Sequence, residues 1–144
     1  MANLKDQLFK VGTGLHEAIF RASKGKVLGK GLGMPMLVLE TTGAKSGAKR
    51  TTMLSTPLVK GDVVVLVASY GGDDRNPAWL HNVQANPNVQ ITLDGATRPM
   101  VARVPEGDER DQLWDELSTA HTNYAGYQKK TDRVIPVVVL EPPT

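Results

Sequence analysis

The segment at 62–69 constrains the fold most, because it reads Asp-Val-Val-Val-Leu-Val-Ala-Ser and is nearly all apolar. A short run of this kind, rich in β-branched residues, is typical of a strand that is covered on both faces. The preceding run at 50–59 and the tight reversal Lys60-Gly61-Asp62 predict a hairpin with it. Other parts of the chain must therefore cover both faces of this strand.

Further short β-forming runs lie at 36–42, 89–93, 98–104 and 134–140. The runs at 89–93 and 98–104 meet at Asp94-Gly95, which is the strongest hairpin signal in the chain. The short connections favour antiparallel pairing, and closure into a barrel removes exposed strand edges. We expect a mainly β fold with appended helices (α+β), a small barrel of about six antiparallel strands, rather than a doubly wound sheet.

Three segments are predicted to be helical, at 4–22, 77–85 and 108–121. The first is amphipathic and runs into a Gly/Lys linker at 24–33, so we divide the chain into 1–33 and a barrel domain at 34–144. The stripe of this first helix fits either the surface of an anionic membrane or packing on the barrel. The second helix is expected to have Asn76 as its N-cap and Pro77 at its first position.

The composition excludes several classes of function. There is no cysteine among the 144 residues, which rules out disulfides, thiol nucleophiles and thiolate metal sites, and the three histidines are too scattered to predict a metal site. The formal net charge of +2 is too small for a general nucleic-acid binder. No apolar run is long enough to span a bilayer, and the first residues lack the apolar core of a signal peptide. We expect a cytosolic protein, attached at most peripherally to a membrane.

The first candidate site is the loop at 41–51, which reads Thr-Thr-Gly-Ala-Lys-Ser-Gly-Ala-Lys-Arg-Thr. Its two glycines let backbone N–H groups approach a ligand, and its three cations and its hydroxyl groups favour a phosphate or carboxylate. The glycine and lysine spacing does not match a P-loop, and no helix follows. The alternative is a solvated hairpin turn whose lysines only aid solubility.

The second and third candidates follow the buried strand. The chain reads Ala-Ser-Tyr-Gly-Gly at 68–72 and continues into the helix at 77–85, so backbone N–H groups are available to an anion or a polar heterocycle. Trp79 either faces that ligand or anchors the helix on the barrel. Tyr124 and Tyr127 are three residues apart and, on a helical turn, would stack on a flat ligand and supply a proton, or else pack over the last strand. Asp132 and Arg133 are expected to form a local ion pair or a terminal cap.

Taken together, five motifs resemble one family: Thr-Thr-Gly-x-Lys-Ser-Gly-x-x-Arg, Ala-Ser-x-Gly-Gly-(x)3-Asn-Pro-x-Trp, Ala-Asn-Pro-x-Val, Tyr-x-x-Tyr-Gln and Asp-Arg-x-Ile-Pro-Val-Val-Val. They are similar to the deazaflavin-dependent nitroreductase family of actinobacterial oxidoreductases, over about 34–142. This resemblance implies a split β-barrel related to the flavin-nucleotide-binding barrels, with the 8-hydroxy-5-deazaflavin coenzyme F-420 as cofactor.

The resemblance also implies which residues contact the cofactor. Lys45 and Arg50 would hold its phosphodiester and oligoglutamate tail, and Tyr127, Tyr124 and Ser69 would be catalytic. The full set of implied cofactor contacts is Lys45, Ser46, Arg50, Thr51, Thr52, Met53, Ala68, Ser69, Tyr70, Gly71, Gly72, Ala78, Trp79, Asn82 and Tyr127. No metal is implied.

The leading functional prediction is an oxidoreductase that transfers a hydride from the reduced deazaflavin to a quinone, an activated enone or a nitroaromatic acceptor. A tyrosine or a bound water would supply the proton. A carrier that stores the coenzyme without turnover and an enzyme that uses a flavin nucleotide such as FMN are the alternatives. A quinone acceptor is consistent with a membrane-surface role for the helix at 4–22, and barrels of this kind often form homodimers.

Overall fold

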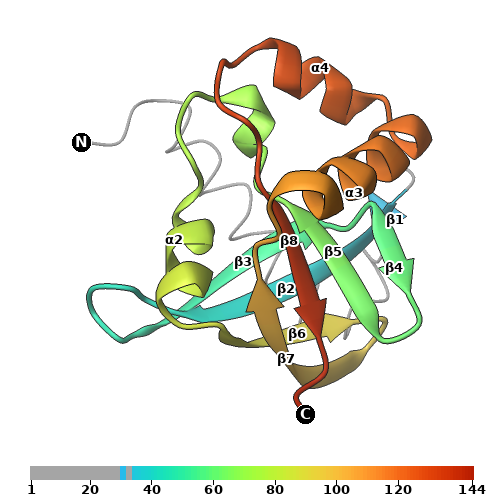
Figure 1. Cartoon of the computed structure of the whole chain (residues 1–144). Helices are drawn as coiled ribbons and strands as arrows, with labels where there is room; N and C mark the ends of the chain where they lie inside the picture. The colour runs from blue at the N-terminus through green and yellow to red at the C-terminus, as the bar shows by residue number, and fades with distance from the viewer. Residues whose placement is uncertain (1–29, 32–33) are drawn as a thin grey trace.

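The computed structural model describes residues 30–31 and 34–144 (Figure 1). The predicted helix at 4–22 and most of the linker at 24–33 lie outside the described residues. Within that linker a two-residue strand, β1 (Lys30–Gly31), pairs with the start of the next strand. No helix in the described part of the chain is both long and apolar enough to cross a membrane.

The fold is one antiparallel sheet with helices against it, which confirms the predicted fold class. Along the sheet the strand order is β1-β2-β6-β7-β8-β5-β4, and β3 pairs with β2. The strands are β2 (Met34–Thr42), β3 (Lys49–Ser55), β4 (Leu58–Lys60), β5 (Val63–Val67), β6 (Asn88–Leu93), β7 (Ala96–Arg103) and β8 (Val137–Glu141). Every strand pairing in 30–31 and 34–144 is antiparallel.

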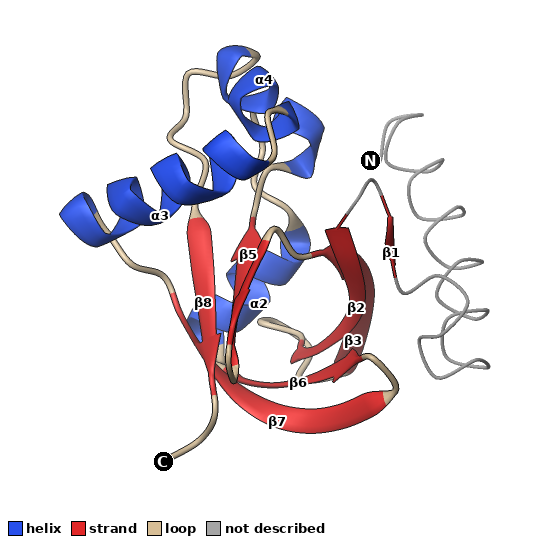
Figure 2. Ribbon diagram, turned by 90° about the vertical axis from the view of Figure 1, so that its right-hand side faces the viewer, coloured by secondary structure: helices blue, strands red, loops and turns tan. Residues whose placement is uncertain are grey.

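The sheet is curled into a split barrel because consecutive strands lie at its opposite ends. β3 lies beside β2 and β4 lies beside β5, yet only two residues separate Ser55 from Leu58. Three Cα steps of 3.8 Å span at most about 11 Å, so the two ends of the sheet must approach each other at this point. Figure 2 shows the strong bend of β2, β6 and β7 that this closure requires.

The prediction of one continuous strand at 50–59 is wrong, because the chain leaves β3 at Thr56 and Pro57. Thr56 is fully buried; its backbone N–H donates to the Pro35 carbonyl at 2.9 Å, and its hydroxyl lies 2.6 Å from the Val65 carbonyl. These contacts join β2 to β5 across the seam of the barrel. Only the part after Pro57 forms the predicted hairpin with β5, and β3 pairs with β2 instead.

β5 is covered on both faces, as predicted. Val64 and Leu66 belong to the core inside the barrel, whereas Val65 and Val67 belong to a second cluster under the helices. The predicted hairpin between β6 and β7 is also confirmed, with its turn at Asp94-Gly95 in the left-handed region. These two features follow from local sequence patterns alone.

In the described part of the chain, the α-helices that cover the barrel are α2 (Ala78–Ala85), α3 (Gly107–Ala120) and α4 (Asn123–Lys129). α2 completes the inner core, with Trp79, Leu80 and Val83 buried in the cluster inside the barrel. α3 and α4 lie against the outer side of β5 and β8, where Leu117 is fully buried (Figure 2). α4 lies outside the predicted helices, in the stretch where the spacing of Tyr124 and Tyr127 was considered only as a helical turn.

Candidate functional site

The basic loop, residues 43–48, connects β2 to β3 and projects beyond the sheet beside α2 (Figure 1). It is closed by its own backbone: the Gly43 N–H donates to Ala48 O at 2.7 Å and the Gly47 N–H donates to Gly43 O at 2.9 Å. Gly47 has a φ of +72°, which a residue with a side chain rarely adopts. The predicted loop between two strands is confirmed, and the positive φ of Gly47 explains why a glycine occupies that position.

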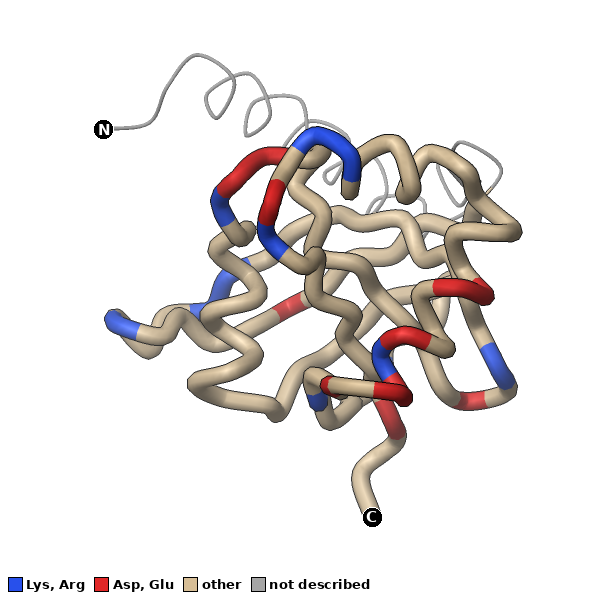
Figure 3. The backbone as a smooth tube through the Cα atoms, turned by 45° about the horizontal axis from the view of Figure 1, so that its top comes forward, with Lys and Arg blue, Asp and Glu red and all other residues tan. Residues whose placement is uncertain are grey.

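Three cations, Lys45, Lys49 and Arg50, are exposed on or beside this loop. None of them forms an ion pair with another residue of the part that the structure describes. A Cβ built on Gly43 would lie 3.6 Å from Arg50 Nε, so the guanidinium rests against the loop backbone. Figure 3 shows basic positions at the tip of the projecting hairpin and farther back along it. Among the described residues, no acidic partner compensates these cations, so the loop presents positive charge to a ligand.

Asn82 on α2 holds the basic loop. Its Nδ2 donates to Thr41 Oγ1 at 3.2 Å, and its Oδ1 accepts from the Ala44 N–H at 3.0 Å. Thr41 is 4% exposed, so the first of these bonds lies largely out of solvent. The structure thereby brings the first and second candidate sites of the sequence analysis together at one place.

The register of β3 divides the residues that were expected to lie along one ligand. Arg50 and Thr52 lie opposite Thr41 and Leu39 of β2, on the face that carries the inner core. Thr51 and Met53 alternate with them and point to the other face. Met53 is buried there against Val38. One face of β3 therefore offers a ligand Arg50 and Thr52 but not their neighbours.

The chain after β5 turns through three successive residues in the left-handed region. They are Tyr70, Gly71 and Gly72, with φ values of 46°, 66° and 83°. A Cβ on Gly72 would lie only 2.9 Å from the Tyr127 carbonyl and 3.0 Å from Lys130 Cδ. The resemblance implied Gly71 and Gly72 as cofactor contacts, but the end of α4 packs against the buried Gly72. Of Tyr70, Gly71 and Gly72, only Gly71 is exposed.

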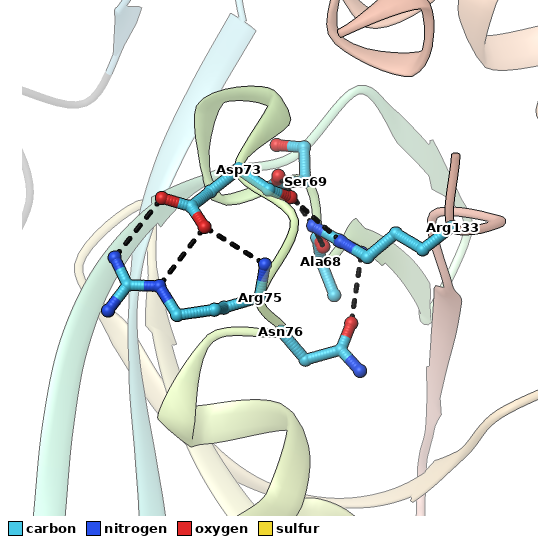
Figure 4. A network of polar contacts seen from close by, with 6 residues as sticks. All are labelled: Ala68, Ser69, Asp73, Arg75, Asn76 and Arg133. Atoms are coloured by element: carbon cyan, nitrogen blue, oxygen red, sulfur yellow. Dashed lines mark hydrogen bonds and ion pairs between the residues drawn. The ribbon is translucent and has the colours of Figure 1, made fainter. Parts of the chain in front are cut away.

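Arg133 spans the loop at 68–76 (Figure 4). Its Nε donates to Asp73 O at 2.8 Å, its Nη1 donates to Asn76 Oδ1 at 2.9 Å, and its Nη2 donates to Ala68 O and Ser69 O at 3.2 and 2.8 Å. Burial lowers the pKa of this guanidinium, and nearby carboxylates oppose that effect. The side chain thus binds the beginning, middle and end of one loop.

Two expectations about this region are wrong. Arg133 neither pairs locally with Asp132 nor caps a helix, since its donors are used by residues 57 to 65 positions away. Pro77, not Asn76, occupies the N-cap of α2, because the Asn76 side-chain oxygen accepts from Arg133. Sequence spacing gave no signal for either contact, because both depend on how distant segments pack.

The two tyrosines differ in their surroundings. Tyr124 is 4% exposed, its hydroxyl lies 3.5 Å from Met34 Sδ, and burial raises the pKa of its phenol. Its ring stands edge-on to Trp114 and to Tyr127, at centroid distances of 6.5 and 6.0 Å. Tyr127 is half-buried, with Lys130 Nζ 5.8 Å from its ring centroid. Tyr124 therefore offers a ligand almost no surface, and Tyr127 is the tyrosine that a ligand could reach.

On α2, Ala78 is exposed and Trp79 is 7% exposed within the barrel core. Trp79 thus anchors the helix, in line with the packing alternative.

Ser46 Oγ accepts a hydrogen bond from the Ala48 N–H at 3.1 Å, so this hydroxyl shapes the basic loop. Arg75 lies over the Tyr70 ring at 5.5 Å and forms an ion pair with Asp73 at 3.1 Å.

Comparisons with known proteins agree on one family. The family model for F420H(2)-dependent quinone reductase matches residues 13–142. An F420H(2)-dependent quinone reductase of Mycobacterium tuberculosis is 42% identical over 130 residues, which cover 88% of this chain and 87% of that protein.

Solved structures show the same relationship. An F420-H2 dependent reductase (FDR-A) superposes with a TM-score of 0.67 at 44% identity, covering 74% of this chain and 94% of its own. A structure described as a domain-swapped dimer superposes with a TM-score of 0.68 at 38% identity, covering 88% of this chain and 96% of its own. An FMN-binding protein of Nostoc punctiforme, 14% identical with a TM-score of 0.52, covers 90% of this chain and 78% of its own and shares the fold alone.

Proposed function

Because this chain belongs to the F420H(2)-dependent quinone reductase family, we propose that it uses the reduced deazaflavin coenzyme F-420 to reduce a quinone. The resemblance drawn from the five sequence motifs is thereby confirmed at the level of F-420-dependent reductases, and the matching family is named for quinone reduction, not for nitroreduction. Activated enones and nitroaromatics are further acceptors to be tested. A carrier role and the use of FMN are less well supported, because the similar proteins are named as reductases that depend on F-420.

The observation that carries the proposal is the uncompensated positive charge of the basic loop. An anionic phosphodiester and carboxylate tail fits Lys45 and Arg50, which are exposed and have no acidic partner among the described residues. Ser46 and the loop backbone add neutral groups, and Asn82 fixes the loop beside α2. The donor set of this loop therefore suits the cofactor that the family implies.

The roles nearer the reacting atoms are assigned by the exposure of the side chains. The bound reduced cofactor supplies a hydride, and reduction of a quinone to its hydroquinone also requires a proton. We assign Tyr127 Oη to hydrogen-bond the acceptor oxygen and to deliver that proton, and Ser69 to line the ring of the cofactor. Tyr124 acts through Tyr127, since its buried ring packs edge-on against the Tyr127 ring.

Affinity measurements test the proposal directly. Purified protein is titrated with F-420 and with FMN by fluorescence, and turnover is followed with a water-soluble naphthoquinone. We expect binding of F-420 in preference to FMN, and weaker binding for Lys45→Ala and Arg50→Ala. Each lost charge-assisted contact should cost about 1.5–3 kcal/mol, and the cost should shrink at high salt.

A matched control removes a different exposed cation. Lys60 lies on β4, on the opposite side of the barrel from the projecting basic loop (Figure 1), and is paired with Glu116 at 2.8 Å. Lys60→Ala should bind F-420 as the unsubstituted protein does. Equal affinity in Lys45→Ala, Arg50→Ala and the control would refute the assigned tail site.

Two further proposals concern assembly and location. The domain-swapped dimer among the similar structures supports a homodimer, which light scattering after size-exclusion chromatography tests. A cytosolic protein that attaches to membranes through the segment at 4–22 rests on the sequence pattern alone. Flotation with anionic vesicles at low salt tests it, and protein that stays in the soluble fraction would contradict it.

A further inference from the structure

Arg133 connects two parts of the proposed site that are distant in sequence. Its guanidinium donates four hydrogen bonds, to Ala68, Ser69, Asp73 and Asn76 (Figure 4). All four acceptors are neutral oxygens, three of the backbone and one of a side-chain amide. The hydrogen bonds therefore fix the course of a loop, and they do not form a simple ion pair.

We infer that Arg133 is a positioning residue that holds the loop at 68–76 in the conformation required for cofactor binding. This inference rests on the proposed function, because the loop includes Ser69 and follows directly on β5. Of the three consecutive residues in the left-handed region, Gly71 and Gly72 adopt it readily because they are glycines, so the need for support comes from Tyr70. Tyr70 carries a side chain and pays a conformational cost there that outside contacts must offset.

The arginine is itself fixed by α4. Gln128 Nε2 donates to the Arg133 carbonyl at 2.7 Å, and Gln128 Oε1 accepts from the Ile135 N–H at 3.1 Å. Gln128 is the neighbour of Tyr127 on that helix. The same residue thus sets the loop that carries Ser69 and is anchored to the helix that carries Tyr127.

The chemistry of the contact calls for arginine. A planar guanidinium directs donors from three nitrogens along several fixed directions, and here all three nitrogens are engaged. A lysine ammonium keeps the charge but presents its donors from a single atom. Arg133→Lys therefore keeps the positive charge but loses the donors on three separate nitrogens, so it shows which of the two holds the loop.

The test compares Arg133→Lys and Arg133→Ala with Arg103→Lys as a matched control. Arg103 also bridges distant elements, pairing with Glu109 at 2.8 Å and with Glu141 at 2.6 Å, but it does not touch the loop. Hydrogen exchange of the amides at 69–75 is measured without cofactor, and the Kd for F-420 is measured by fluorescence. Thermal melts of all variants are recorded alongside.

We expect Arg133→Lys to speed exchange at 69–75 at least tenfold while the amides of β2 and β6 keep their protection. The Kd for F-420 should rise at least tenfold, and Arg103→Lys should change neither quantity. Unchanged exchange and Kd in Arg133→Lys would overturn the inference, as would exchange that rises equally throughout the barrel. If Arg133→Ala does not fold, the lysine variant decides alone. Failure of the unsubstituted protein to bind F-420 would refute the proposed function, whereas the exchange comparison would still test the hold on the loop.

Discussion

Replacing Asn82 by alanine should release the basic loop without changing its charge. The substitution removes the hydrogen bonds to Thr41 Oγ1 and from the Ala44 N–H. Each such bond contributes about 1 kcal/mol net, so the held state of the loop should lose about 2 kcal/mol. That value corresponds to a shift of up to about 30-fold in the ratio of held to released loop.

The effect on affinity follows from this shift. If only the held loop binds the anionic tail, the Kd for F-420 rises by the factor by which the held population falls, so about 30-fold is the upper limit. Lys45 and Arg50 are not substituted in this variant, so the charge of the loop is unchanged. The slope of log Kd against log salt concentration should therefore match that of the unsubstituted protein.

Asn82→Asp separates the hold on the loop from its electrostatics. A carboxylate still accepts from the Ala44 N–H and also accepts from the Thr41 hydroxyl, so the loop should stay in place. It adds a negative charge beside the three cations, worth about 1 kcal/mol per pair at 4 Å in water. We expect weaker binding at low salt, with a shallower salt dependence than either of the other proteins shows.

Fluorescence titrations with F-420 at low and high salt, together with thermal melts, measure both effects. Gln84→Ala is the control, because Gln84 is an exposed residue of the same helix. Affinity and stability that are unchanged in Asn82→Ala would show that Asn82 does not hold the loop. A shallower salt slope in the alanine variant would instead indicate that Asn82 orients the cations themselves.

Three further substitutions test other parts of the structure. Thr56→Val removes the hydroxyl that contacts a β5 carbonyl across the barrel seam, and it should lower the free energy of unfolding by about 1–3 kcal/mol, or the Tm by roughly 3–10 °C. The control Thr97→Val, at an exposed site, should lower it much less. Equal losses in the two variants would contradict a stabilising role for the Thr56 contact. Tyr127→Phe should keep the Kd for F-420 and lower kcat, and full turnover would point to water as the proton source. The pKa of Glu109 is lowered by the hydrogen bond from Arg103, so its contribution to stability is present at neutral pH and is lost as pH falls below about 4.5. Glu109→Gln should therefore show a weaker loss of stability in acid urea titrations, and an identical acid profile would refute this assignment.

The strands that sequence analysis predicted correctly are those whose pattern is local. The apolar run of β5 and the Asp94-Gly95 turn each carry their own signal, and both are confirmed. The break after β3 was missed, although the sequence carried a signal for it. That signal is Pro57, because a proline within a β-forming run disfavours a continuous strand. What the sequence could not supply is the partner of Thr56, since its contact with Val65 exists only once the barrel has closed.

The candidate site divides in the same way. The composition of the basic loop predicted an anion site, because charge and glycine content are properties of the segment itself. The alternation of side chains along β3 was a usable signal that the neighbours of Thr52 could not share its face. The exposure of Tyr127 and the burial of Tyr124 depend instead on how α4 packs against Trp114 and Met34, which no spacing encodes.

Each of the two loops of the proposed site is held by a single polar side chain from another part of the chain. The chemistry of that side chain suits the groups that the loop must present. The basic loop must keep Lys45 and Arg50 available, so a neutral amide from Asn82 holds it where a carboxylate would neutralise them. The loop after β5 turns several carbonyl oxygens to one side, so a cation with many donors, Arg133, holds it. A loop that binds a charged ligand cannot use the same charges to stabilise itself, and its support must therefore come from residues outside the motif that binds.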